Sequence, residues 1–200
     1  MCLKKIFYLF IAVLLCASFY LIYPEDEIRY EPGILVESEP DQTTIINAAS
    51  WTRDEFTITP LAEFHLKARV LSYENYSLGK ESKISPVDLA LGWGPMSDQL
   101  NLDQIEIKQR NRWYYWKTKT IAAPQSIITG HSANMHIIPA SPEIDDELNE
   151  IRRGSLIELT GYLVIVNTDE GWTWKSSLSR KDSGEGACEL FWVNELKLIN

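Results

Sequence analysis

Cys188 is the side chain best suited to covalent chemistry in this 200-residue sequence. It follows the small, polar stretch SGEGA and is the only cysteine beyond residue 23. A thiolate nucleophile needs a neighbouring base, for which His131 or His136 would serve, with an acid such as Asp182 nearby. Such a constellation would support a hydrolase or a transferase.

The residues after Cys188 favour a structural role instead. They read ELFWV, an apolar run typical of a strand, on which Cys188 would share one face with Leu190 and Trp192. A lone cysteine in that setting is most often a small buried side chain. We therefore predict no catalytic residue and keep an enzyme that uses Cys188 with His131 or His136 as the alternative.

The segment HSANMH places two histidines five residues apart. A helical metal pair needs a spacing of four, and on a strand a spacing of five puts the side chains on opposite faces. We therefore predict no metal site. The polar interpretation is that His131, Asn134 and His136 contact the hydrogen-bonding groups of a ligand or fix a loop.

The segment KQRNRWYYWKTK (108–119) interleaves basic and aromatic residues. Such a pattern can stack flat groups while it meets anions, and we predict Arg112, Trp113 and Trp116 as binding residues. The competing interpretation follows from strand geometry, because two pairs of aromatic residues then face opposite ways and at least one pair belongs to the core.

The polar segment SSLSRKDSGEG (176–186) is longer than a hairpin connection requires. Its hydroxyls, backbone N–H groups and one arginine would suit an anion or a peptide, so we predict Ser177, Arg180 and Asp182 as further binding residues. The alternative is a hairpin loop whose composition serves turn geometry alone. The common signatures for nucleotides, zinc, serine hydrolases and thiol redox chemistry are missing, and we predict no cofactor.

The N-terminus predicts a membrane anchor. Residues 6–23 form an uncharged apolar run of 18 residues, about the minimum for a membrane-spanning helix. Lys4 and Lys5 precede it and PEDE follows, which places the N-terminus in the cytoplasm. A cleaved signal peptide and a lipoprotein anchored through Cys16 are the alternatives, but small residues are missing where either cleavage would need them.

Three regions follow from this pattern: a transmembrane signal anchor (1–23), an acidic, proline-containing tether (24–56) and a periplasmic, mainly β domain (57–200). The formal charge of −9 argues against a nucleic-acid partner. The expected partners are the membrane, through residues 6–23, and an envelope protein or glycan.

The domain is predicted to be α+β and mainly β, with one curved antiparallel sheet or a small OB-like barrel and one helix. In the first strand, Phe64, Leu66, Ala68 and Val70 are expected on the buried face. The predicted elements are a strand (61–76), a short helix within 85–98 that ends at Gly92, a strand over 102–122 that is long and bent, a short strand, a helix (141–154) and three strands (155–167, 172–176, 188–199).

Four blocks carry a resemblance to a family of short bacterial proteins of unknown function: LALGWGPMSD, NRWYYWKT, HSANMHIIPA and SSLSRKDSGEGACELFWV. The resemblance covers roughly residues 61–195. It implies a bacterial inner-membrane anchor with a periplasmic domain, and it implies no activity.

These observations predict a single-pass inner-membrane protein that presents a periplasmic binding or assembly module. The alternatives are the Cys188 enzyme and a structural subunit of an envelope complex.

Overall fold

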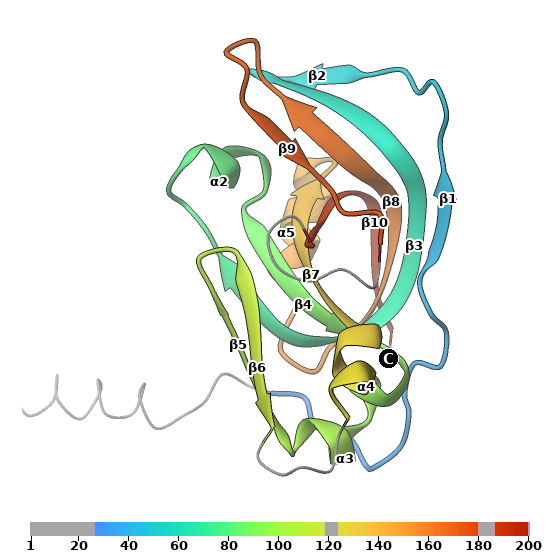
Figure 1. Ribbon diagram of the computed structural model, residues 1–200. Coiled ribbons are helices and arrows are strands. Elements are labelled where there is room, and N and C mark those ends of the chain that lie inside the picture. The colour runs from blue at the N-terminus through green and yellow to red at the C-terminus, as the bar shows by residue number, and fades with distance from the viewer. Residues whose placement is uncertain (1–26, 119–123, 180–186, 200) are drawn as a thin grey trace, which may run out of the picture.

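The computed structural model describes residues 27–118, 124–179 and 187–199, and these form a mainly β domain with short helices, in line with the α+β prediction (Figure 1). The strands are β1 (Asp41–Thr44), β2 (Trp51–Arg53), β3 (Phe56–Asn75), β4 (Val87–Gly92), β5 (Ile105–Arg110), β6 (Trp113–Thr118), β7 (Ser132–Pro139), β8 (Leu156–Asn167), β9 (Thr173–Lys175) and β10 (Glu189–Ile199). The helices are α2 (Lys80–Ile84), the 3-10 helix η1 (Gly94–Ser97), α3 (Gln99–Leu102), α4 (Gln125–Gly130) and α5 (Pro142–Leu148).

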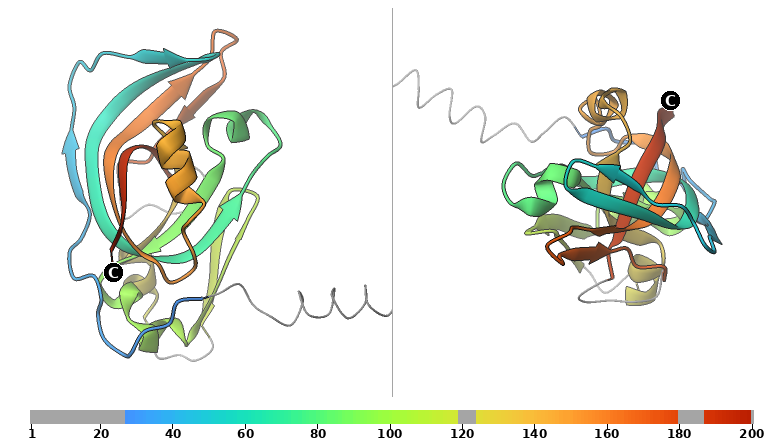
Figure 2. Two further views of the ribbon diagram at one scale, coloured as in Figure 1. Left: turned by 180° about the vertical axis from the view of Figure 1, so that it is seen from behind. Right: turned by 90° about the horizontal axis from the view of Figure 1, so that it is seen from above.

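Five strands form a closed barrel. Their order is β3-β4-β7-β10-β8, and β8 pairs again with β3. The β7–β10 pair is parallel and the other pairs are antiparallel, so the sheet is mixed and the prediction of a single antiparallel sheet is wrong. Helix α5 connects β7 to β8 and lies behind the strands in the view of Figure 1, as the reversed view of Figure 2 shows.

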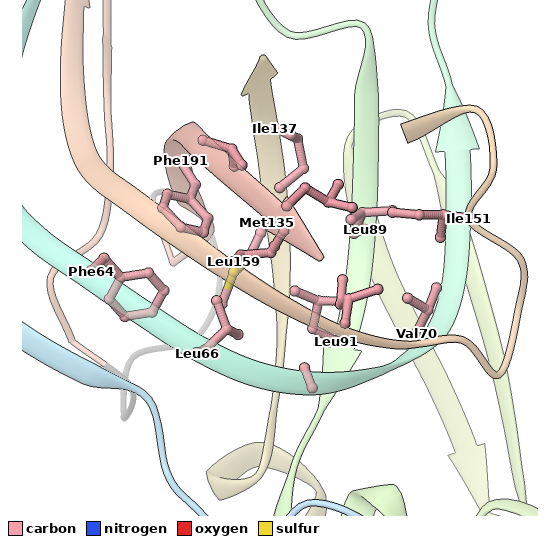
Figure 3. Packing of buried hydrophobic residues seen from close by; sticks show 14 of the residues in the cluster. Phe64, Leu66, Val70, Leu89, Leu91, Met135, Ile137, Ile151, Leu159 and Phe191 are labelled. Atoms are coloured by element: carbon pink, nitrogen blue, oxygen red, sulfur yellow. The ribbon is translucent and has the colours of Figure 1, made fainter. Parts of the chain in front are cut away.

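The alternating apolar residues of these strands point inward and form the main core. Figure 3 shows side chains from β3, β4, β7, β8 and β10 meeting there, with the rings of Phe64 and Phe191 edge to face at 5.1 Å. The predicted buried face of β3 is confirmed, because Phe64, Leu66, Ala68 and Val70 are all buried. Burial of apolar surface at about 25 cal/mol per Å² makes this core the main source of stability.

The helix predicted at 141–154 is confirmed over Pro142–Leu148, with Ile144, Leu148 and Ile151 buried against the barrel. The strands predicted at 155–167, 172–176 and 188–199 are also confirmed as β8, β9 and β10.

The short helix predicted in 85–98, ending at Gly92, is wrong, because Val87–Gly92 forms strand β4. All six residues of β4 are buried, since one face lies in the barrel core and the other lies under the β5–β6 hairpin. A strand buried on both faces has no polar and apolar alternation, so its pattern does not differ from that of a short helix. Only Gly94–Ser97 is helical, as η1.

The long, bent strand predicted at 102–122 is two strands, because the chain does not bend but reverses in its middle. Asn111 and Arg112 both have positive φ (54° and 68°), the geometry of a two-residue type I′ turn between β5 and β6. The familiar signal for this turn is Asn-Gly, and an arginine at the second position conceals it.

Residues 27–56, the described part of the predicted tether, lie on the barrel. Strand β1 pairs with β3, and Val36 is buried in the main core. Gly154, at φ +90°, packs so closely under this segment that a Cβ there would lie 2.0 Å from the carbonyl oxygen of Ile28. The predicted membrane segment 6–23 lies outside the described residues, and within them no helix has the length and apolar character needed to cross a bilayer.

Candidate functional site

Strands β4 and β7 carry polar residues on the outer face of the barrel, although that face is covered. Asp88 and His136 are register partners on these strands, and both are buried. The tip of the β5–β6 hairpin, strand β9 and the end of β3 meet over them. We call Asp88, His136, Arg112, Trp174 and Tyr76 the Asp88 cluster.

Arg112 joins the hairpin tip to the barrel. Its Nη1 donates to Asp88 Oδ1 at 2.6 Å, and its Nη2 donates to the carbonyl oxygen of Ser85 at 2.9 Å. The guanidinium carbon lies 3.7 Å from the ring centre of Tyr76 and 5.6 Å from that of Trp174. The backbone N–H of Arg112 donates to the Tyr76 hydroxyl at 2.9 Å, and burial raises the pKa of that hydroxyl. A residue with positive φ is thus held by contacts in several directions.

His136 also faces the Asp88 carboxylate. Its Nδ1 lies 2.9 Å from Asp88 Oδ1 but is not aligned for a hydrogen bond, and among the described residues Asp88 Oδ2 accepts none. The imidazole ring lies against that of Trp174, with 4.7 Å between the ring centres. The Asp88 carboxylate is therefore bound by Arg112 and only approached by His136, whose imidazole would need a small rotation to donate to it, as the histidine of a catalytic site does.

Cys188 lies beside this cluster and is half-buried. Its Sγ is 3.7 Å from Asn134 Nδ2 and 4.0 Å from the carbonyl oxygen of Arg112. Gln109 Nε2 donates to Asn134 Oδ1 at 2.6 Å, which turns the amide nitrogen of Asn134 toward the sulfur. Cys188 directly precedes β10, and Leu190, two residues later, is the register partner of His136.

The exposed side of the β5–β6 hairpin is a second candidate. Three register pairs form it: Glu106 with Lys117, Lys108 with Tyr115, and Arg110 with Trp113. We call these six residues the hairpin face. Trp113 is 39% and Tyr115 is 53% exposed, so two large aromatic rings lie in solvent between cations. Lys108 Nζ pairs with Glu106 Oε1, the one carboxylate of the hairpin face, at 2.5 Å.

The other side of the hairpin packs on the barrel. Tyr114 and Trp116 contact the apolar cluster that includes Ile105, Ile107 and Ile128. Burial raises the pKa of Tyr114 to about 12, although its hydroxyl donates to Ser132 Oγ at 3.1 Å. The prediction that one aromatic pair belongs to the core is therefore confirmed for this pair.

The structure gathers Arg112, Asn134, His136 and Cys188 from the predicted site residues, while Trp113 lies nearby on the hairpin face.

The remaining predicted site residues do not join the Asp88 cluster. The Nδ1 atom of His131 lies 2.9 Å from the carbonyl oxygen of Ile127, at the end of α4. The amide of Ser177 donates to the carbonyl oxygen of Cys188 at 3.0 Å, so Ser177 is a buried structural neighbour of the cluster. Arg180 and Asp182 lie outside the described residues.

Three residues of the cluster were missed by sequence reasoning: Asp88, Tyr76 and Trp174. Asp88 did carry a signal, because it is the single charge within the apolar run VDLALG. Such a charge is rarely buried unless it has a partner. Tyr76 and Trp174 carried none, since their role depends on packing over Arg112.

Within residues 27–118, 124–179 and 187–199, no three His, Cys, Asp or Glu side chains converge as a metal site. Comparison with protein-family models, with curated proteins and with solved structures found no match for the chain.

Proposed function

We propose that this chain is a single-pass protein of the bacterial inner membrane whose periplasmic domain is a binding module. In this proposal residues 6–23 anchor the chain with its N-terminus in the cytoplasm. The domain is a small OB-like barrel, and the hairpin face is its recognition surface. The five-stranded closure supports the barrel assignment, as does α5 between the third and fourth barrel strands.

The observation that carries the proposal is the composition of the hairpin face. It places two exposed aromatic rings among three cations on a chain whose formal charge is −9. Trp, Tyr and Arg are the residues that most often dominate binding energies, because they offer large contact areas with a polar end. Since Trp113 and Tyr115 are held on a strand, little conformational entropy is lost when a partner binds.

The Asp88 cluster supports this role by fixing the hairpin. A two-stranded hairpin is marginally stable on its own. Here its far side packs on the barrel, and its tip is held through Arg112 to Asp88 and Ser85. The recognition surface is therefore preorganised in this proposal.

Site-specific photo-crosslinking in cells tests the proposed surface. A photoreactive amino acid replaces Trp113 or Tyr115 in the full chain, and the matched control replaces Leu198, which is 46% exposed on β10. We expect crosslinked products from the two hairpin positions and few from position 198. Equal yields at all three positions would contradict the assignment of the hairpin face.

A second candidate is the thiol enzyme that uses Cys188 with His136. The contact between His136 and the Asp88 carboxylate favours it, together with the amide of Asn134 near the sulfur. This candidate requires a reactive thiolate, so Cys188 in the native chain should be alkylated with an apparent pKa well below the ordinary thiol value of about 8.5. The binding module predicts instead that Cys188→Ala leaves the crosslinking pattern unchanged. A thiol that reacts only after unfolding would exclude the enzyme.

A further inference from the structure

We infer that the hairpin face docks on the anionic lipid surface of the membrane from which the chain emerges. This inference rests on the proposed function, because it names the partner of the same surface. The partner is a bilayer that exposes phosphate headgroups, and the contact is made by Trp113 and Tyr115 together with the surrounding cations.

The chemistry of the hairpin face fits a membrane interface. Tryptophan and tyrosine are enriched at the headgroup level, where an amphipathic ring meets both apolar and polar surroundings. Lys108, Arg110 and Lys117 surround the two rings, and the single carboxylate, Glu106, is paired with Lys108. This face therefore carries a net positive charge on an acidic chain, and anionic headgroups attract such a patch.

The point at which the chain reaches the domain places the hairpin near the bilayer. Glu27, the first described residue, lines a small cavity with Leu102 and with Ile107 of β5. Two residues later, Arg29 Nη2 donates to Asp103 Oδ1 at 2.6 Å, just before β5 begins. The described chain therefore starts beside the first residues of β5, at the open end of the hairpin.

The short connection limits how far the domain can move from the membrane. Three residues separate Glu27 from the predicted membrane segment 6–23. Fully extended, this connection spans at most about 14 Å at roughly 3.5 Å per residue. A six-residue strand such as β6 is itself about 20 Å long. The hairpin face is therefore within reach of the headgroups, whereas a partner at a distance from the membrane would need a longer connection.

Quenching by brominated lipids tests the docking. The full chain is reconstituted into phosphatidylcholine vesicles with or without phosphatidylglycerol, and the brominated lipid quenches tryptophans at the interface. All seven tryptophans of the chain lie beyond residue 50, so residues 1–26 contribute no tryptophan signal. We expect quenching in the anionic vesicles that is lost in Trp113→Phe and retained in Trp51→Phe, because Trp51 lies on β2 against Tyr162 and Trp192 and belongs neither to the hairpin face nor to the Asp88 cluster.

The charge requirement is tested with the variant Lys108→Gln/Lys117→Gln. Each lysine near an anionic surface contributes enough that losing two should weaken docking by roughly tenfold or more. High salt should have the same effect. Quenching that persists in Trp113→Phe, or that is equal in vesicles with and without phosphatidylglycerol, would overturn the inference.

The two proposals fail in distinguishable ways. If anionic vesicles give no Trp113-dependent quenching while crosslinking in cells still maps to positions 113 and 115, the hairpin face is a recognition surface for a glycan or a protein. The lipid inference is then wrong and the proposed function stands. If both experiments are negative, the proposed function fails as well.

Discussion

Replacing Asp88 with asparagine tests whether a buried charge pair holds the tip of the β5–β6 hairpin. Asparagine keeps the size of the side chain and a hydrogen-bond acceptor, so Arg112 loses only its counter-charge. The two side chains are 1% and 18% exposed, which leaves little solvent to compensate. Removing one partner of a buried ion pair costs about 3–5 kcal/mol. We expect about 3 kcal/mol, the lower end of that range, because Arg112 keeps its bond to the Ser85 carbonyl.

Urea unfolding of the full chain in detergent micelles, followed by the near-ultraviolet signal of the tryptophans, measures this loss. The companion variants are Arg112→Met and the double variant Asp88→Asn/Arg112→Met. Because the double variant leaves no unpaired charge, its loss of unfolding free energy should be about 1–2 kcal/mol smaller than the sum of the losses in the two single variants. The matched control is Glu106→Gln, whose exposed pair with Lys108 should contribute less than about 1 kcal/mol.

The reasoning is refuted if Asp88→Asn costs less than about 1 kcal/mol or if the losses of the two single variants simply add. Either result would mean that Arg112 is held by its contacts with Tyr76, Trp174 and Ser85 and not by charge. Crosslinking from the hairpin face should also weaken in Asp88→Asn, because a loosened tip no longer presents a preorganised surface.

Three further predictions concern pH and backbone packing. Because the pKa of Tyr114 is raised to about 12 in the folded chain, the stabilising contribution of Tyr114 is fully present below pH 10 and decreases as the pH rises toward 12. The stability advantage of wild type over Tyr114→Phe should therefore shrink by about 1.4 kcal/mol between pH 9 and 11 in urea titrations, and a constant difference would contradict the burial argument. The hydrogen bond from His65 lowers the pKa of Glu158 below its ordinary value of 4.5. The stabilising contribution of Glu158 is therefore present above pH 4.5 and is lost as the pH falls through the lowered pKa. Wild type and Glu158→Gln should accordingly converge in stability in acid, and a stability difference that grows in acid would contradict the lowered pKa. A Cβ at Gly161 would lie 1.9 Å from a backbone carbonyl oxygen of β10, so Gly161→Ala should lower the melting temperature strongly. The control is Gly130→Ala, whose Cβ would meet nothing within 4 Å and which should leave the melting temperature nearly unchanged. Similar melting temperatures for the two variants would mean that the β8–β10 contact relaxes.

Local patterns in the sequence were sufficient for the elements with one buried face. The alternation around Phe64 and Leu66 predicted β3, and the stripe Ile144–Leu148–Ile151 predicted α5. The acidic turn after Asn167 predicted the β8–β9 hairpin. In each case the signal lies within a few consecutive residues, because one face meets the core and the other meets water.

The same logic explains the failures. Strand β4 has no solvent face, so the sequence around Asp88 shows no period. The Asn111–Arg112 turn has positive φ at both residues, and Arg112 is held there by Asp88 of β4, a contact that the neighbouring residues in the sequence do not encode. The segment around Val36 was predicted as part of an acidic tether because it has prolines and little periodicity, yet it supplies a core residue.

The sequence by itself determined that this is a folded, acidic, mainly β domain behind an apolar N-terminal segment, and which aromatic and basic residues were available for binding. Only the tertiary structure decided which of them meet. Asp88, Arg112 and His136 come from three separate segments, and the registers of β4 with β7 and of β5 with β6 bring them together. The register of two strands is set by the packing of the whole barrel, so the residues of one strand do not by themselves indicate which residues of another strand lie opposite them.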